Sequence, residues 1–303
     1  MKASPKEYFV YYIYIFFKFL FTVLPKSFVK YILIFCAKVI FKFDKEHKHI
    51  AKVNLDLAYK DSISDEQKNI IIYESYKSLL FNMYEFIENQ SISKEKLLSK
   101  AKLENEEVIL NAIKNNRKII FFSAHYGGWE LAIPFIALKF GTVAIVNREM
   151  NNPLINDMYK KVRNNNNIIM IDKKTAAKGV IKALKQDQFV TVVIDQHIKG
   201  GEEIEFFDQK VKATDSTSRL ALKFDAVLIP IFCVMNDFRD YTIKMEKAID
   251  VSSYEFKTDN KIKELTQLQN TIIENQIKQK PELWFWQHRR FKYKHNEFYK
   301  RNK

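Results

Sequence analysis

The sequence predicts an α/β fold in which helices flank a largely parallel mixed sheet. Helical and strand-like patterns alternate from residue 118 to residue 234. The strand-like runs are short and continuously apolar, as expected of strands that are covered on both faces. No repeat, low-complexity linker or clear boundary interrupts the chain after residue 50. We therefore expect one folded domain over residues 51–303, preceded by N-terminal hydrophobic helices within residues 1–50.

The spacing of apolar residues predicts each element in turn. Residues 64–89 repeat apolar side chains at helical spacing, with acidic residues near the start that favour a helix N-terminus. Residues 118–124 are a short, mostly apolar run, which predicts a buried central strand. The other predicted strands are residues 142–146, 168–171, 189–194, 227–234 and, at a sheet edge, 241–248. The other predicted helices are residues 106–114, 129–140, 152–164, 176–186, 217–224 and 261–278.

The first 50 residues indicate a membrane anchor. Residues 8–24 are apolar or aromatic apart from Lys18 and Thr22, and they are at the short limit for a helix that crosses a bilayer. Residues 28–43 predict a basic amphipathic helix of the kind that lies in the membrane interface. A hydrophobic helix packed on the main domain is the alternative. The excess of Lys after Leu24 predicts that the main domain faces the cytoplasm.

The net charge of +14 is concentrated at the two ends of the chain. Residues 1–53 carry ten Lys against three acidic residues, and residues 287–303 carry seven Lys or Arg against one. The body between them is close to neutral. Proteins that coat nucleic acid usually spread basic residues over the folded body. We therefore expect an anionic membrane surface as a partner, and no nucleic acid.

We expect no cofactor and no metal ion. The cysteines Cys36 and Cys233 have no metal-ligand spacing, and we interpret both as buried apolar residues of a reduced compartment. The acidic cluster of Glu202, Glu203 and Glu205 has no ligand partners at useful spacing, so we predict a solvated loop there. A glycine-rich phosphate loop is also absent from the sequence.

A candidate catalytic base follows the predicted central strand. His125 comes directly after residues 118–124, and a Gly-Gly pair lies between it and Glu130. Ligands gather at the carboxyl ends of strands in α/β sheets, and the glycines permit a turn across which both side chains converge. A neutral imidazole accepts a proton from a hydroxyl, and a carboxylate on its other nitrogen fixes the tautomer. We therefore expect His125 to be the general base and Glu130 its orienting carboxylate. A core histidine beside a helix N-terminal acid is the alternative.

Several motifs stand in a fixed order from about residue 54 to residue 292. They are His125-x4-Glu130, the Arg-containing segment 147–154, Arg163, segment 178–185, Asp195-Gln196, segments 205–207, 213–214 and 229–231, and segment 286–292. Together they resemble the late acyltransferases of lipid A biosynthesis (the lauroyl/myristoyl transferase family), a branch of the lysophospholipid acyltransferase superfamily. Two positions depart from the family pattern. Asp208 stands where the family often has Gly, and Asn147 stands where it commonly has Tyr.

The resemblance implies a glycerolipid-acyltransferase-like fold and a membrane-associated O-acyltransferase. The donor it implies is an acyl thioester, acyl-acyl carrier protein, and the acceptor is a hydroxyl of a lipid A precursor on the cytoplasmic side of the inner membrane. No Ser or Cys occupies a nucleophile elbow, so we expect direct attack without a covalent acyl-enzyme. Expected substrate-binding residues are Asn147, Arg148, Arg163 and Asp195. Expected contacts to the membrane or to the acidic donor are His288, Arg289, Arg290 and Lys292, beside Trp284 and Trp286.

Two alternatives stay open from the sequence. The same chemistry could act on another lipid acceptor, such as a lysophospholipid or a glycolipid. A non-catalytic protein that binds a membrane surface through its basic ends would instead leave His125 and Glu130 dispensable.

Overall fold

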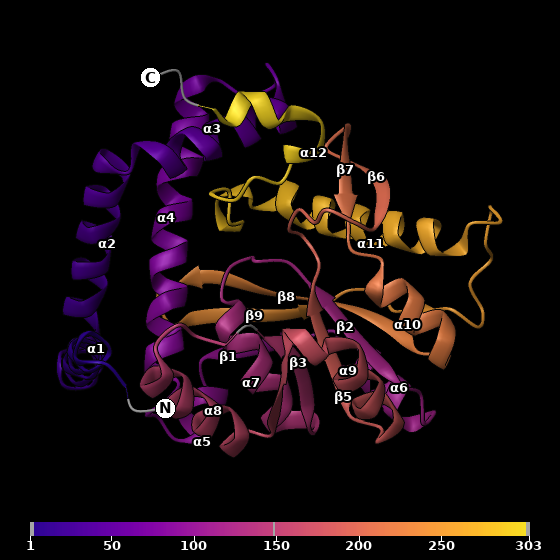
Figure 1. The fold of residues 1–303 in the computed structure, drawn as a ribbon, viewed down its shortest axis with the longest axis horizontal. Coiled ribbons are helices and arrows are strands. Elements are labelled where there is room, and N and C mark those ends of the chain that lie inside the picture. Colours follow the sequence, from indigo (N-terminus) through magenta and orange to yellow (C-terminus); the bar gives the residue numbers. More distant parts are fainter. Residues whose placement is uncertain (1–2, 148, 301–303) are drawn as a thin grey trace.

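The computed structural model describes residues 3–147 and 149–300, and in this part of the chain an eight-stranded mixed sheet forms the centre (Figure 1). Seven strands lie in the order β1-β9-β8-β2-β5-β3-β4, and β10 pairs with β8. All neighbours from β8 to β4 are parallel, whereas β9 and β10 are antiparallel to β8. The strands are β1 (Ala101–Glu104), β2 (Ile119–Ser123), β3 (Val143–Asn147), β4 (Ile168–Asp172), β5 (Phe189–Val193), β8 (Val227–Asp237), β9 (Asp240–Met245) and β10 (Ile249–Asp250).

Helices connect and cover these strands. α7 packs on β3, β4 and β8 and is itself covered by α4, while α9 packs on β3, β4 and β5, and α10 on β2 and β8. This arrangement confirms the predicted mostly parallel sheet flanked by helices. The helices after the N-terminal region are α4 (Asp65–Glu88), α5 (Lys94–Leu98), α6 (Glu107–Lys114), α7 (Trp129–Phe140), α8 (Pro153–Asn165), α9 (Ala176–Lys185), α10 (Ser216–Phe224), α11 (Lys261–Gln279) and α12 (Lys292–His295), with short 3-10 turns at Lys173–Thr175, Pro281–Leu283 and Asn296–Tyr299.

The buried strand β2 confirms the interpretation of residues 118–124. All five residues of β2 are buried, because β8 and β5 flank it and helices cover its faces. Its continuous apolar sequence is the pattern expected in that position. The carboxyl end of β2 therefore lies in the middle of the sheet, next to the carboxyl end of β5.

Two predictions about the remaining strands were wrong. Residues 241–248 were predicted to form an edge strand, but β9 is internal, and the short β1, which the sequence pattern did not reveal, lies outside it. The cluster of Glu202, Glu203 and Glu205 is not a solvated loop but part of β6 (Glu202–Phe206), which pairs with β7 (Gln209–Ala213) in a separate hairpin. The hairpin buries Phe206 against the C-terminal segment, and this burial fixes the strand despite the charges around it.

The N-terminal region folds as three helices, α1 (Pro5–Val23), α2 (Lys26–Phe43) and α3 (Lys45–Tyr59). α2 buries Val29, Leu33 and Ala37, which are spaced by four residues and join the same core as the sheet. α1 has no buried residue and instead leaves large apolar side chains exposed. Exposed on the two helices are Tyr8, Phe9, Val10, Tyr12, Ile13, Phe16, Phe17, Phe19, Val23, Phe28, Tyr31, Phe35, Val39 and Phe43.

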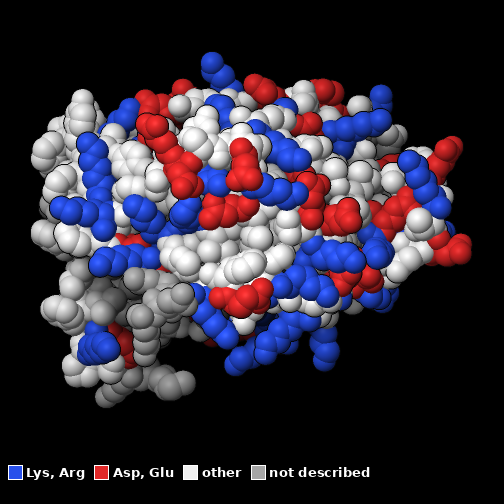
Figure 2. Space-filling view, turned by 90° about the horizontal axis from the view of Figure 1, so that it is seen from above, with Lys and Arg blue, Asp and Glu red and all other residues white. Residues whose placement is uncertain are grey.

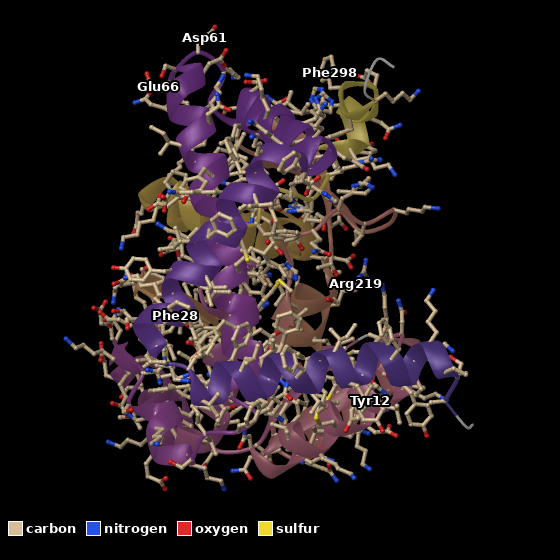
Figure 3. The ribbon with its side chains drawn as sticks, turned by 90° about the vertical axis from the view of Figure 1, so that its left-hand side faces the viewer. Tyr12, Phe28, Asp61, Glu66, Arg219 and Phe298 are labelled. Atoms are coloured by element: carbon tan, nitrogen blue, oxygen red, sulfur yellow. The ribbon has the colours of Figure 1, made fainter. Side chains whose placement is uncertain are left out.

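Among the described helices, none combines the length and the apolar character required to cross a membrane. α1 lies against α4 and α8, and Figure 3 shows it running beneath α2, with Tyr12 on α1 and Phe28 near the start of α2. Asp61, Glu66 and Phe298 lie at the opposite end of the molecule in that view. The exposed aromatic side chains of α1 therefore lie at one end, and those of α2 extend from there toward α3 (Figure 1).

Candidate active site

The pairing of β2 with β5 brings His125 to Asp195. The register sets Ser123 opposite Val193, and the backbone N–H of Ile194 donates to the Ser123 carbonyl over 3.0 Å. Two residues beyond this register, each strand ends in a polar side chain. His125 Nδ1 lies 2.8 Å from Asp195 Oδ1, and the His125 backbone N–H donates to Asp195 Oδ2 over 2.9 Å. One carboxylate thus fixes both the ring and the backbone of His125.

The Asp195 carboxylate is fully buried and is itself held from a third direction. The indole N–H of Trp284 donates to Asp195 Oδ2 over 2.8 Å. Burial alone would raise the pKa of Asp195, but the charge and hydrogen bond of His125 outweigh it and hold that pKa well below its usual range. Burial also opposes a charged His125, yet the Asp195 carboxylate prevails and raises the pKa of the imidazole. The pair therefore favours an ionised carboxylate that stabilises an imidazolium.

The second ring nitrogen of His125 opens on a pocket. Nδ1 faces Asp195, and within residues 3–147 and 149–300 no hydrogen-bond partner is present at Nε2. The side chain of His125 remains 27% exposed. The pocket has a volume of about 420 Å³, and its lining residues are His125, Trp129, Glu130, Ile133, Ile145, Val146, Asn147, Tyr159, Arg163, Lys173, Thr191, Val192, Val193 and Gln196. A substrate hydroxyl in this pocket can approach Nε2 directly.

The turn between His125 and Glu130 depends on two glycines. Gly127 has a φ of +56°, and a Cβ built on it would lie 2.1 Å from the Cys233 carbonyl oxygen. Its N–H donates to the Leu283 carbonyl over 2.8 Å, and the N–H of Gly128 donates to the Cys233 carbonyl over 2.9 Å. The turn is therefore clamped between β8 and the C-terminal segment, which places the first turn of α7 over the pocket.

Glu130 lines the same pocket as His125, as the turn predicted, but it does not orient the imidazole. The carboxylate at Nδ1 is Asp195, so the prediction that Glu130 fills this position was wrong. Glu130 instead accepts a short hydrogen bond from Arg163 Nη2, and the Arg163 guanidinium stacks over the Tyr159 ring at 4.8 Å. The charge of Glu130 still adds a smaller upward contribution to the pKa of His125.

The other predicted substrate-binding residues divide into three groups. Asn147 and Arg163 line the pocket, Arg163 as the nearly buried partner of Glu130. Asp195 is completely buried behind His125, so its place in the structure is that of a positioning residue and not of a substrate contact. Arg148 lies outside the described residues.

The C-terminal basic segment is only partly a surface feature. Trp284, Trp286 and Arg290 are buried, which contradicts the prediction that they form an exposed aromatic-basic cluster. Arg290 donates to the carbonyls of Gln196 and Lys212 and to Asn270 Oδ1. It therefore holds the loop after Asp195 in place.

His288, Arg289 and Lys292 do reach the surface. Together they line a shallow depression of about 430 Å³ beside α3. His288 also lies next to the site, because its Nε2 is 3.3 Å from the Asp195 carbonyl and its Nδ1 is 2.7 Å from the Phe285 carbonyl. Burial lowers the pKa of His288 to about 4, so this ring is uncharged at neutral pH.

The sequence did not reveal the place of several residues in this site. Trp284 stands 89 residues beyond Asp195, and only the folded C-terminal segment brings its indole to the carboxylate. Tyr159, Lys173 and Gln196 line the pocket from three different elements or loops. Among the described residues, no group of three or more His, Cys, Asp or Glu is placed to hold a metal ion.

Comparison with known proteins identifies the family of this chain. The model of the bacterial lipid A biosynthesis acyltransferase family matches residues 2–293. A lipid A biosynthesis acyltransferase from Haemophilus influenzae is 25% identical over 84% of this chain and 81% of its own length. The Escherichia coli lipid A biosynthesis palmitoleoyltransferase is 25% identical over 82% of this chain and 80% of its own, and lipid A biosynthesis acyltransferase 2 of Shigella flexneri is 24% identical over 86% and 83%. The family match spans nearly the whole chain and includes both His125 and Asp195, so this protein belongs to the bacterial lipid A biosynthesis acyltransferases.

Proposed function

We propose that this enzyme moves a fatty acyl chain from acyl-acyl carrier protein to a hydroxyl of a lipid A precursor. The observation that carries the proposal is the His125–Asp195 pair, whose free Nε2 opens on a pocket at the carboxyl end of β2. The family supports acyl transfer to lipid A, and the relatives are named for lipid A biosynthesis.

In the proposed reaction, His125 acts as general base. Nε2 takes the proton from the acceptor hydroxyl while the oxygen attacks the thioester carbonyl, and Asp195 keeps Nδ1 protonated and stabilises the imidazolium. The tetrahedral intermediate then expels the thiolate, which takes the proton back from Nε2. No covalent acyl-enzyme is required, because the hydroxyl and the thioester meet in one pocket.

Glu130 has a separate task in this scheme. Its carboxylate is paired with Arg163, and the pair forms one wall of the pocket. A second negative charge near His125 favours the imidazolium that forms during the reaction. The Glu130–Arg163 pair thus fixes the pocket wall. The larger effect on the pKa of His125 comes from Asp195.

The acyl chain is assigned to the apolar side of the site. Trp129, Ile133, Thr191 and Val193 line both the catalytic pocket and an apolar crevice of about 20 Å³ that leads toward Phe121. The crevice offers apolar contacts to the first methylene groups beyond the thioester. A long chain requires side chains such as Ile133 to move, because the present volume is close to that of a single water molecule.

The donor is assigned to the depression formed by His288, Arg289 and Lys292. This depression shares Gln196 with the catalytic pocket, so a carrier protein docked there has a short path for its thioester arm. Its exposed cations are Arg289 and Lys292, and acidic partners favour such a surface. Arg290 is excluded from this contact by its burial.

The acceptor is assigned to the membrane side, at α1 and α2. Their exposed aromatic residues and interspersed Lys are typical of segments that lie in the interface of an anionic bilayer. We place the enzyme on the cytoplasmic face of the inner membrane, where a soluble carrier protein and a membrane lipid are both within reach.

A transfer assay with purified components tests this function. The full-length enzyme is incubated with acyl-acyl carrier proteins of graded chain length and a tetra-acylated lipid A precursor, and the products are analysed by mass spectrometry. We expect one acyl chain to be added to the precursor. Acylation of a lysophospholipid or glycolipid offered in parallel, with no product from the lipid A precursor, would replace the proposed acceptor.

A further inference from the structure

A second polar pocket lies where α1, α2, α4, α5 and the turn between β8 and β9 meet. We call it the junction pocket. Its volume is about 380 Å³, within the range of small-molecule sites. It has no lining residue in common with the catalytic pocket. Its polar lining includes Lys26, Lys96, Arg239, Glu88, Ser91 and Ser93.

Cations outnumber the one carboxylate that lines this pocket. Glu88 lies 3.3 Å from Lys26 Nζ, 3.0 Å from Arg239 Nε and 2.5 Å from the buried Lys100 Nζ. Burial opposes its ionisation, but these cations lower the pKa of Glu88 to about 2, so it is a full negative charge. Lys100 does not line the pocket, and it is shared with the buried Glu85, 2.6 Å away. The lining itself carries Lys26, Lys96 and Arg239 against Glu88, which is an excess of positive charge.

Two of these cations have unused donors. Arg239 donates through Nε to Glu88, and neither of its terminal nitrogens has a hydrogen-bond partner in the described part of the chain. Lys96 Nζ likewise has none among the described residues, and the side chain is exposed. Ser93 Oγ accepts from the Lys96 backbone N–H, which leaves its own hydroxyl hydrogen free to donate. These free donors surround a pocket of excess positive charge.

Arg239 lies in the two-residue turn between the paired residues Asp237 and Asp240. Its backbone has a φ of +63°, a conformation that L-residues other than Asn and Asp rarely adopt. The neighbouring Phe238 packs on Phe81 and Tyr84, with ring centroids 4.9 and 4.8 Å apart, and so anchors the turn. The anchored turn directs the Arg239 guanidinium to Glu88 and the pocket.

We propose that the junction pocket binds a phosphate group, and that the phosphate belongs to the head group of a bilayer lipid. Arg and Lys donors with serine hydroxyls match the oxygens of a phosphate. The lipid source follows from location. Thr22 and Lys26 line the pocket at the α1–α2 junction, between the exposed Val23 at the end of α1 and the exposed Phe28 near the start of α2. The assignment to a bilayer lipid rests on the proposed position of the enzyme at a membrane surface, whereas the assignment to a phosphate group does not.

Binding to vesicles tests the proposal without any acyl donor. The full-length protein is titrated with phosphatidylcholine vesicles that contain or lack phosphatidic acid, and bound protein is measured by co-sedimentation. Lys96→Gln and Arg239→Gln should each weaken binding to the phosphatidic acid vesicles about tenfold, the effect of losing one hydrogen bond from a charged donor to the phosphate. Lys94→Gln is the matched control, because Lys94 is exposed on the same helix but does not line the pocket.

Inorganic phosphate identifies the source of the ligand. A ligand that binds the folded state raises the thermal midpoint, so phosphate should stabilise the wild type and stabilise Lys96→Gln much less. If phosphate acts in this way but the pocket variants bind phosphatidic acid vesicles like the wild type, the site takes free phosphate and the lipid assignment is wrong. Loss of as much vesicle binding by Lys94→Gln as by Lys96→Gln would overturn the site itself. So would pocket variants that match the wild type both in vesicle binding and in stabilisation by phosphate. These results are independent of acyl transfer, so they remain decisive if the proposed reaction fails.

Discussion

The imidazole of His125 is held on one side, by the Asp195 carboxylate at Nδ1, and is open to the pocket at Nε2. The orientation is doubly secured, because the same carboxylate accepts the His125 backbone N–H and the Trp284 indole N–H. These hydrogen bonds and the charge of His125 favour the ionised form of the Asp195 carboxylate despite its complete burial. At the scale of residues, the proposed base is therefore oriented by a fully buried carboxylate.

Asp195→Asn removes the charge and keeps the shape. We expect kcat to fall by about 10²–10⁴-fold, since an amide no longer stabilises the imidazolium and permits the wrong tautomer. Because Asp195 raises the pKa of His125, the acid limb of the wild-type kcat profile should lie above the ordinary histidine value of about 6.5. In Asp195→Asn this limb should move to lower pH. A pH profile of kcat measures both effects, and an unshifted limb would show that Asp195 does not control the base.

The Glu130–Arg163 pair makes a prediction about stability. Arg163 is nearly buried, so Arg163→Ala leaves Glu130 unpaired and should lower the free energy of unfolding by about 3 kcal/mol. The double variant Arg163→Ala/Glu130→Gln removes the stranded charge and should recover much of that loss. Urea denaturation of the two variants and the wild type gives the comparison. A double variant no more stable than Arg163→Ala would argue against the pair as the cause.

From the sequence, His125 and the position of Glu130 at the pocket were predicted correctly. The carboxylate that bonds His125 was predicted to be Glu130, but it is Asp195. Spacing along the chain favours Glu130, which is five residues from His125. Only the adjacency of β2 and β5 brings Asp195, seventy residues away, to Nδ1. Strand order depends on long-range packing, and local periodicity does not report it.

At the scale of elements, the link from β2 to α7 sets the geometry of the site. β2 ends between β8 and β5, and the Gly127-Gly128 turn directs the chain into α7, whose first residues Trp129 and Glu130 cover the pocket. The turn is bonded on both sides, to Leu283 and to Cys233. A local change at this turn therefore affects both the sheet and the pocket.

Gly127→Ala tests the turn. A Cβ would collide with the Cys233 carbonyl, and the φ of +56° is costly for alanine, so we expect a thermal midpoint lower by several degrees and loss of most activity. Gly200→Ala is the matched control, because no atom lies within 4 Å of the added Cβ. Equal midpoints for the two variants would contradict the clamped turn.

Periodicity located most elements because they are amphipathic or fully apolar. It missed β1, which is only four residues long and alternates half-buried and exposed side chains. It also missed the hairpin β6–β7, whose charged residues hide the buried Ile204 and Phe206. Both are held by packing against distant segments, and their own sequence has no strong preference for a strand.

At the scale of the whole molecule, apolar and charged surfaces are separated. The exposed aromatic residues gather on α1 and α2, whereas the face seen in Figure 2 intersperses Lys and Arg with Asp and Glu. The basic ends found in the sequence therefore do not merge into a continuous basic surface on that face. The burial of Arg290 and the two tryptophans was unpredictable from composition, because their buried partners come from distant segments.

The exposed face of α1 predicts how the enzyme meets a membrane. Phe9, Tyr12 and Phe16 are spaced by three and four residues, lie on one side of α1 and are each more than half exposed. Replacing all three with Ser should weaken binding to anionic vesicles at least ~10-fold, because their insertion into the interface is lost. Phe298→Ser, at the opposite end of the molecule, should leave vesicle binding unchanged (Figure 3). Equal binding by the triple variant and the wild type would contradict α1 as a membrane contact.

The central claim is that His125 is the base for acyl transfer. The most direct measurement is the turnover of full-length His125→Ala with acyl-acyl carrier protein and the lipid A precursor, together with its thermal midpoint. We predict a turnover at least ~100-fold below that of the wild type at an unchanged midpoint, the loss expected when a general base is removed. Near-normal turnover of a folded His125→Ala enzyme would contradict the mechanism proposed for this site.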